Sequence, residues 1–233
     1  IFYGDLDVTE IRDKPRARAE TVTAIVSARK YEAMLDYIGA EAEKGNQSYF
    51  VCPRIEGDEE GSLISARELY EELSARLPRV RFALLHGKMK EKEKADVMAD
   101  FKAKKYDCLV STTVIEVGVD VPDATIMVIY NAERFGLSQL HQLRGRVGRG
   151  TKKSYCFLLL GADSEEARAR LAAVKNNADG FKIAEIDLEM RGGGDFLGTR
   201  QSGHLLGDVE RLRYPKSVIF TAKKLADEAL AAG

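Results

Sequence analysis

The stretch CLVSTTVIEVGVDVPDATIMVIY, residues 108–130, contains two short apolar runs separated by a more polar loop. The runs, residues 108–111 and 126–130, have the length and composition of buried strands. Strands that are continuously apolar are typical of parallel sheets. Ligands of such sheets bind in loops at the carboxyl ends of strands, so residues 111–125 are a first candidate for a binding site.

Strand and helix patterns alternate on both sides of this stretch. Apolar and β-branched runs predict further strands at residues 21–27, 48–52, 80–85 and 154–160. Apolar stripes at helical spacing predict helices at residues 31–42, 65–77, 91–103 and 137–144. This alternation predicts an α/β fold, in which a mostly parallel sheet is covered by helices on both faces.

Two details of the predicted helices depend on single residues. Ser65 and Glu68 are spaced as a capping box, so the second helix is expected to begin there, after an acidic loop at residues 56–61. The residues of the third helix that are expected to face the core are Ala95, Met98 and Phe101.

The pattern changes after residue 162. Ser164 is placed to cap a helix, a second helix is expected at about residues 183–190, and a glycine-rich stretch follows. The chain opens on IFYGDLDV, which resembles the end of a strand, so we expect a further domain before it. We therefore predict a connector at residues 1–20, a main domain at 21–162, and a C-terminal helical hairpin with a loop at 163–233.

Composition narrows the class of protein. The net charge of the 233 residues is −1, whereas a protein that coats nucleic acid is usually strongly basic, so any such binding must come from a local group of Arg and Lys. Cys52, Cys108 and Cys156 each lie in an apolar run, which predicts buried thiols and no metal site. No signal peptide or membrane-length apolar stretch is present, and these features together predict a cytoplasmic protein.

The segment QLRGRVGR, residues 142–149, is the strongest chemical signal. Its arginines, Arg144, Arg146 and Arg149, are separated by small residues that let them reach outward. Guanidinium groups match the oxygens of phosphate, and an arginine beside a transferring phosphoryl group stabilises its charge. The alternative for such a short string is a basic surface turn.

The loop STTVIEVGVDVPDAT, residues 111–125, offers hydroxyls and carboxylates. Ser111, Thr112 and Thr113 can donate to phosphate, and Glu116 and Asp120 can accept from amide or ribose hydroxyl donors. Taken alone, Asp120 is equally well explained as a turn residue before a proline.

Together, in this order, these two strings resemble motifs V and VI of the superfamily two helicases. LLHGKM, residues 84–89, also resembles the C-terminal lobe of these proteins, and the resemblance covers roughly residues 20–160. It implies that residues 21–162 form the second RecA-like domain of a two-lobed motor.

The resemblance also implies roles for individual residues. Arg146 and Arg149 correspond to arginine fingers that face ATP held on the other lobe. The other positions implied to act on the nucleotide are Gln142, Glu116, Gly118 and Asp120, and those implied to contact DNA are His86, Gly87, Thr112 and Thr113. For His86 a plain role as the last residue of a strand stays open.

The tail EMRGGGDFLGTRQSG, residues 189–203, resembles the translocation motif of the RecG family of branch-migrating helicases. In that family it acts as a lever that couples lobe closure to movement along duplex DNA, which implies coupling roles for Arg191, Arg200 and Gln201. Gly193 departs from the proline that is common there. A loop that only packs on the sheet, the related tail of the transcription–repair coupling translocase, and a non-catalytic α/β nucleic-acid-binding module remain alternatives.

The sequence contains neither a GxxxxGK[ST] phosphate loop nor a DExH box. We therefore expect that ATP and Mg²⁺ are held mainly by another lobe, that this chain has no cofactor of its own, and that it is inactive alone. The expected partners are branched or duplex DNA and the N-terminal lobe and wedge domain of the same protein, with no membrane.

Overall fold

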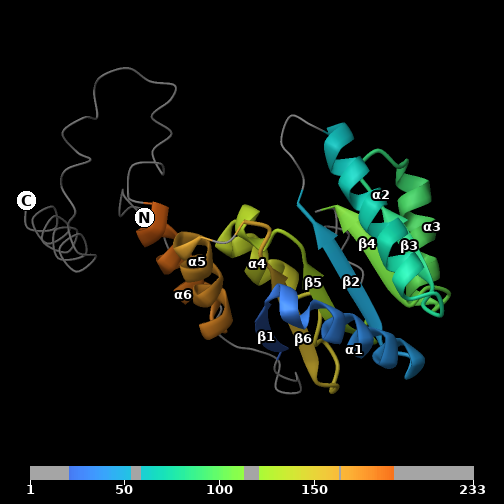
Figure 1. The fold of residues 1–233 in the computed structure, drawn as a ribbon, viewed down its shortest axis with the longest axis horizontal. Helices are drawn as coiled ribbons and strands as arrows, with labels where there is room; N and C mark the ends of the chain where they lie inside the picture. Colours follow the sequence, from blue (N-terminus) through green and yellow to red (C-terminus); the bar gives the residue numbers. More distant parts are fainter. Residues whose placement is uncertain (1–20, 54–58, 113–120, 163, 192–233) are drawn as a thin grey trace, which may run out of the picture. The chain divides into compact units, whose positions relative to one another are not determined.

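Parallel strands in the order β1-β6-β5-β2-β4-β3 form a single sheet (Figure 1). The computed structural model describes residues 21–53, 59–112, 121–162 and 164–191. The strands are β1 (Thr21–Val26), β2 (Gln47–Cys52), β3 (Phe82–Leu85), β4 (Cys108–Thr112), β5 (Ala124–Ile129) and β6 (Ser154–Leu159). Each pairing among them is parallel, as the apolar runs of the sequence predict.

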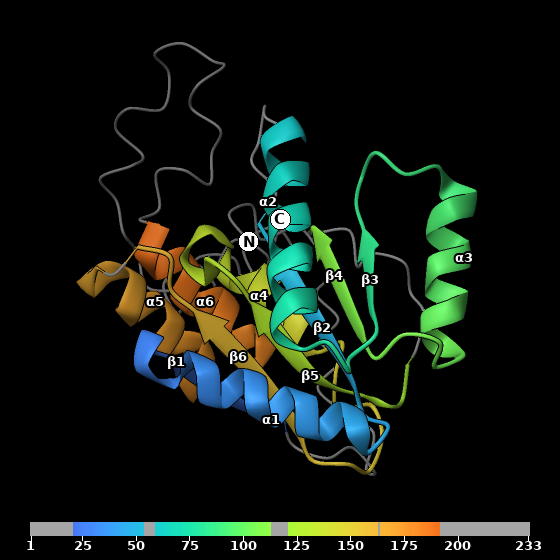
Figure 2. The same ribbon diagram turned by 45° about the vertical axis from the view of Figure 1, so that its right-hand side comes forward.

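Helices cover both faces of this sheet (Figure 2). They are α1 (Tyr31–Glu43), α2 (Glu59–Arg76), α3 (Glu91–Lys102), α4 (Leu137–Arg144), α5 (Glu165–Asn176) and α6 (Gly180–Arg191), with short 3-10 turns η1 (Ala28–Lys30) and η2 (Ala132–Arg134). Apolar residues of α1 and α2 form one core with side chains such as Phe50 and Val110. Residues of α3, α4, α5 and α6 form a second core with side chains such as Tyr49 and Leu109. The predicted α/β fold is confirmed.

The chain divides into two compact units, which we describe separately. The larger, Pro15–Asp187, contains the sheet, α5 and most of α6. Of the smaller unit, Ile1–Lys14 with Leu188–Gly233, the structure describes only residues 188–191, the end of α6. The domain limits expected at residues 20 and 162 stay predictions.

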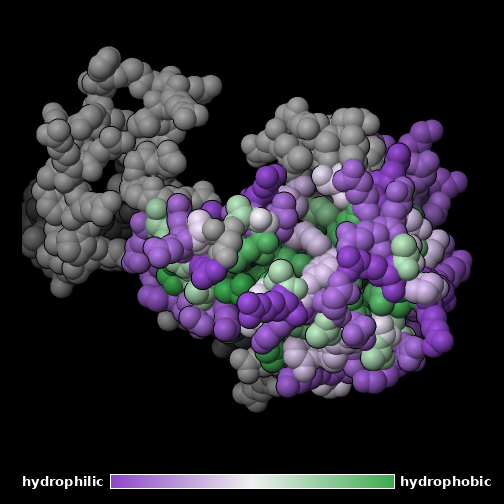
Figure 3. All heavy atoms as spheres, viewed as in Figure 1, coloured by the Kyte–Doolittle hydropathy of each residue, from purple (hydrophilic) through white to green (hydrophobic). Residues whose placement is uncertain are grey.

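Several local predictions are confirmed. The hydroxyl of Ser164 accepts a 3.1 Å hydrogen bond from the backbone of Ala167, so it caps α5 as its position predicts. Cys52, Cys108 and Cys156 are buried and unpaired, and burial raises the pKa of Cys52 and of Cys156 to about 12. Hydrophilic residues dominate the outer parts of the described surface in Figure 3, with hydrophobic residues gathered nearer its centre.

Two predictions about helices are wrong. Helix α2 begins at Glu59, before the predicted cap at Ser65, because a single glycine inside a helix costs only about 1 kcal/mol and the residues around it are good helix formers. In α3, Ala95 is exposed and Lys94 is buried. The aliphatic part of Lys94 joins the inner face, and its ammonium donates to Glu91 Oε1 at 2.8 Å.

Candidate functional site

His86, Gly87 and Thr112 lie together at the carboxyl edge of the sheet. Thr112 is the last residue of β4, and His86 directly follows β3. These strands are neighbours, with Leu85 opposite Ser111, so the two residues that come next also lie side by side. Gly87 is exposed, and a Cβ atom added to it would meet nothing within 4 Å. The structure thus brings together the described members of the predicted DNA-facing group.

Polar atoms at this edge are left unsatisfied by the described residues. The Nδ1 atom of His86 and the hydroxyl of Ser111 are buried and have no hydrogen-bond partner there. Burial lowers the pKa of His86, and the positive charges of Arg67, Lys88 and Lys94 lower it further, against an opposing effect of Glu93. Buried polar atoms without a partner are uncommon in folded proteins, and other such atoms lie elsewhere in the described sheet, among them Oε1 of Gln47 at the amino edge.

The QLRGRVGR segment begins in the last turn of α4 and continues into the loop after it, and its three arginines differ in burial. Arg144 is buried, with its Nη1 atom donating to the carbonyl oxygens of Val174 at 2.7 Å and Asn177 at 2.9 Å. Its Nη2 atom lies 2.7 Å from Nδ1 of His141. The prediction that Arg144 reaches outward is therefore wrong, because carbonyls at the end of α5 satisfy its guanidinium inside the fold.

The segment after α4, residues 145–150, is called the arginine loop below. Gly148 has a φ of 73°, and a Cβ atom there would come within 2.5 Å of Thr21 Oγ1 and 3.3 Å of Ser154 Cβ. Thr21 and Ser154 are the first residues of β1 and β6. A Cβ on Gly150 would lie 3.5 Å from the carbonyl oxygen of Pro122, just before β5. The arginine loop is therefore packed against the amino ends of the strands, opposite the edge with His86.

Of the three arginines of QLRGRVGR, Arg146 and Arg149 are not buried. Arg149 is exposed and its Nε atom donates to the carbonyl oxygen of Gly145 at 3.5 Å, while Arg146 is half-buried. No carboxylate of the described residues pairs with Arg146. Gln142, on the last turn of α4, is exposed as well. Guanidinium groups that the fold leaves accessible can donate paired hydrogen bonds to phosphate oxygens.

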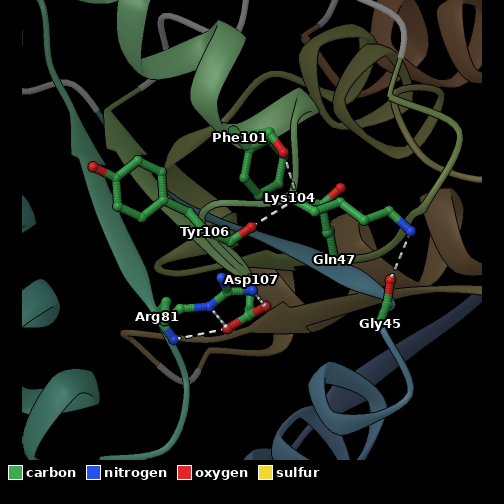
Figure 4. A network of polar contacts seen from close by, with 7 residues as sticks. All are labelled: Gly45, Gln47, Arg81, Phe101, Lys104, Tyr106 and Asp107. Atoms are coloured by element: carbon green, nitrogen blue, oxygen red, sulfur yellow. Dashed lines mark hydrogen bonds and ion pairs between the residues drawn. The ribbon is translucent and has the colours of Figure 1, made fainter.

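A polar network lies at the same amino edge, partly drawn in Figure 4. The side chain of Gln47 donates to the carbonyl oxygens of Phe101 and Tyr106, at 2.6 and 2.7 Å. Arg81 pairs with Asp107 at 2.6 Å. The ammonium of Lys104 lies 3.5 Å from the carbonyl oxygen of Gly45.

A separate group at this edge is formed by Asp123, whose carboxylate pairs with two lysines that lie far apart in the sequence. Lys104 and Lys152 each approach it at 2.7 Å. Hydrogen bonds from Lys104 and then Lys152 lower the pKa of Asp123. Sequence analysis did not find this group, and no motif or spacing in the sequence indicates it.

The remaining predicted residues cannot be placed in the site. Thr113, Glu116, Gly118, Asp120, Arg200 and Gln201 lie outside the described residues, and Arg191 is the last residue of α6. Among the described residues, no group of His, Cys, Asp and Glu could hold a metal ion. No helix in the described part of the chain is long and apolar enough to cross a membrane.

Comparison with known proteins identifies the family. The family described as helicase conserved C-terminal domain matches residues 29–151, which include β2 to β5, α4 and the arginine loop. The chain belongs to this family. The helicase C-terminal domain thus contains both edges described above, with His86 and Thr112 at one and Arg146 and Arg149 at the other.

Relatives of this helicase domain carry the name RecG. The chain is 50% identical over 203 residues to the ATP-dependent DNA helicase RecG of Thermotoga maritima. The aligned residues cover 87% of the chain and 26% of the relative. It is 48% identical over 227 residues to RecG of Synechocystis sp., covering 97% of the chain and 27% of the relative. The resemblance to RecG expected from the tail is confirmed, for a chain that spans about a quarter of these relatives.

Solved structures agree with this assignment. The structure of RecG bound to a three-way DNA junction matches with a TM-score of 0.71 and 47% identity, over 90% of this chain and 27% of that one. Dbp5 of S. cerevisiae bound to RNA and ADP BeF3 matches with a TM-score of 0.51 and 16% identity, over 75% of this chain and 45% of that one. The second likeness shows only a shared fold.

Proposed function

We propose that the chain is the second motor lobe of an ATP-dependent DNA helicase that remodels branched DNA, such as stalled forks and junctions, in recombination and repair. The observation that carries this proposal is the difference in burial among the three arginines of QLRGRVGR. Arg144 is held inside the fold, whereas Arg146 and Arg149 lie on a packed loop at one edge of the sheet. A basic surface turn would need neither a buried first arginine nor a glycine fitted against two strands.

The arginine loop is proposed to act on ATP that is held, with Mg²⁺, mainly by the first lobe of the complete protein. ATP supplies the phosphoryl transfer that drives the motor. Arg146 and Arg149 donate hydrogen bonds to its terminal phosphate and stabilise the charge that develops there. Gln142, exposed on the adjacent turn of α4, orients the nucleotide. Because the sequence contains no phosphate loop to hold ATP, the chain alone is proposed to be inactive.

The opposite edge is proposed to contact DNA. The matching RecG structure is that of a protein bound to a three-way DNA junction. His86, Gly87 and Thr112, together with Thr113, are proposed to contact the DNA backbone at the carboxyl edge. Sequence positions 113–120 connect the end of β4 at this edge with residues that precede β5 at the other, so Glu116, Gly118 and Asp120 are proposed to link nucleotide state to DNA.

The tail and the remaining partners complete the proposal. Arg191, Arg200 and Gln201 are proposed to couple lobe closure to movement along duplex DNA. The other partners are the N-terminal lobe and a wedge domain of the same protein. Three unpaired, buried cysteines agree with a cytoplasmic protein, where thiols stay reduced.

The test uses the complete enzyme and its DNA-stimulated release of phosphate. Arg146→Ala and Arg149→Ala are expected to lower turnover by about 10³–10⁵-fold, the usual contribution of an arginine finger. Both variants should keep the melting temperature of the wild type, because neither side chain is buried. Arg79→Ala is the control, since the side chain of Arg79 is 89% exposed and Arg79 shortly precedes β3, the strand at the other end of the sheet from β1 and β6. Near-normal turnover in both loop variants would contradict the proposal.

A further inference from the structure

We infer that Asp123 and Lys152 form an ion pair that positions the arginine loop for catalysis, and that both are therefore positioning residues of the motor. This inference rests on the proposed function. Asp123 lies in the loop of residues 111–125 that resembles motif V, but neither Asp123 nor Lys152 is among the residues for which the resemblance implies a role. Their contact joins the segment before β5 to the segment before β6.

Asp123 connects three separate parts of the amino edge. Its backbone carbonyl oxygen accepts a 2.8 Å hydrogen bond from the backbone of Gln47, the first residue of β2. Its Oδ1 atom accepts from Lys152 and its Oδ2 atom pairs with Lys104, each at 2.7 Å. The carboxylate is thus fixed on a backbone that is itself bound to the sheet, which makes it a firm attachment point.

Lys152 attaches the far end of the arginine loop to that point. It lies two positions after Gly150, and its ammonium donates both to Asp123 and to Oδ1 of Asn46 at 2.8 Å. Asn46 is held in turn, because its Nδ2 atom donates to Glu41 Oε2 at 2.6 Å. Two different elements therefore fix the position of this one ammonium.

The rest of the loop is held by close backbone packing. A Cβ atom on Gly148 would collide with Thr21, whereas one on Gly150 would make only an ordinary van der Waals contact with the carbonyl oxygen of Pro122. Arg149 lies between these two glycines, so its backbone is fixed on one side by packing and on the other by packing and the Lys152 pair. Loss of the Asp123–Lys152 pair is therefore expected to loosen the backbone after Arg149 and to leave the backbone before Arg149 in place.

An ion pair of this exposure is a weak source of stability. The side chains of Lys152 and Asp123 are 49% and 31% exposed, and pairs that accessible contribute little to folding. Placement of a catalytic group is far more sensitive, because a shift of about 1 Å can lower a rate about 100-fold. A positioning role thus predicts a loss of turnover with hardly any loss of stability.

The experiment measures DNA-stimulated ATPase kinetics and thermal unfolding of the complete enzyme. Asp123→Asn and Lys152→Met are each expected to lower kcat by about 10–100-fold while the KM for ATP changes by less than about twofold, as for an interaction used only in the transition state. The double variant should be about as slow as the slower single variant, since each single change already removes the shared Asp123–Lys152 pair. Lys152→Arg keeps a cation that can reach Asp123 and should retain most of the turnover.

Asp107→Asn is the matched control. Asp107 also lies at the amino edge, but its carboxylate pairs with Arg81 at 2.6 Å rather than with Lys152. Turnover of this variant should stay near that of the wild type. Equal effects of Asp123→Asn and Asp107→Asn on kcat would overturn the inference, as would a loss of kcat that follows a matching fall in melting temperature.

The outcomes separate this inference from the proposed function. A wild-type enzyme without DNA-stimulated ATPase activity would refute the proposed function itself. If Arg149→Ala abolished turnover while Asp123→Asn and Lys152→Met left it intact, the proposed function would stand and only the positioning role would fall.

Discussion

The Nη1 atom of Arg144 donates a 2.7 Å hydrogen bond to the carbonyl oxygen of Val174 and thereby joins α4 to the end of α5. The last carbonyls of a helix have no partner within it, and a buried guanidinium satisfies two of those near the end of α5. The first arginine of QLRGRVGR is therefore part of the fold, and the arginine loop begins from a fixed residue.

Replacing Arg144 tests this structural role. Arg144→Met is expected to lower the free energy of unfolding by about 2–3 kcal/mol, because buried carbonyls lose charged donors. Arg146→Met, two residues further on and half-buried, should change it by no more than about 0.5 kcal/mol. Guanidinium chloride unfolding of the purified chain gives both values. Similar losses of unfolding free energy in the two variants would contradict the structural role of Arg144.

Gly148 can be tested against two other glycines. Gly148→Ala combines a φ of 73° with a Cβ that would approach Thr21 Oγ1 to 2.5 Å, so we expect a loss of about 2–3 kcal/mol. Gly45→Ala has a φ of 78° but open space, and should lose only about 1 kcal/mol. Gly87→Ala has open space and no such φ, and should be close to neutral. Thermal unfolding ranks the variants, and equal stability of all three would exclude a fitted loop.

His86 should make stability depend on pH. Its pKa in the fold is lowered from the ordinary value of 6.5, chiefly by burial. The unfolded chain therefore takes up the proton first, and the free energy of unfolding should fall as the pH drops through about 6.5 and level off below the folded pKa. His86→Asn removes this contribution. Unfolding curves at about pH 7.5 and 5.5 should show a smaller pH-dependent loss in the variant than in the wild type, and equal losses would rule the effect out.

The purified chain is expected to release no phosphate from ATP, with or without branched DNA. The reason is that the sequence lacks a phosphate loop, while its arginines are proposed only to complete a site formed with another lobe. A colorimetric phosphate assay measures this directly. Robust turnover stimulated by DNA would mean that the chain holds a nucleotide site of its own.

Gln201→Ala and Arg200→Ala are expected to separate ATP hydrolysis from DNA remodelling in the complete enzyme. Both residues belong to the GTRQSG segment, outside the strings that are proposed to face the nucleotide, so hydrolysis should persist while junction unwinding falls. The measured quantity is ATP consumed per junction resolved, which should rise well above the wild-type ratio. Parallel loss of both activities would instead place the segment in the ATP site.

The parallel α/β sheet could be predicted from the sequence because its signal is local. Runs such as residues 108–111 and 126–130 are apolar enough to be buried on both faces, and that pattern specifies parallel strands whatever lies elsewhere in the chain. The arginine and loop motifs were also found from sequence, since their chemistry depends on neighbours within a few residues. The match of residues 29–151 to the helicase C-terminal family confirms the resemblance, while the roles of single residues stay predictions.

The tertiary structure decided what depends on distant partners. Arg144, Arg146 and Arg149 are alike in the sequence, yet only Arg144 meets the carbonyls of Val174 and Asn177, about thirty positions away, and so is buried. Asp123 pairs with Lys152, 29 positions further along the chain, and nothing in the sequence around either residue indicates this pairing. A charged side chain stays in solvent unless partners inside the fold offset the cost of its burial, so its place is decided only when the fold brings those partners together.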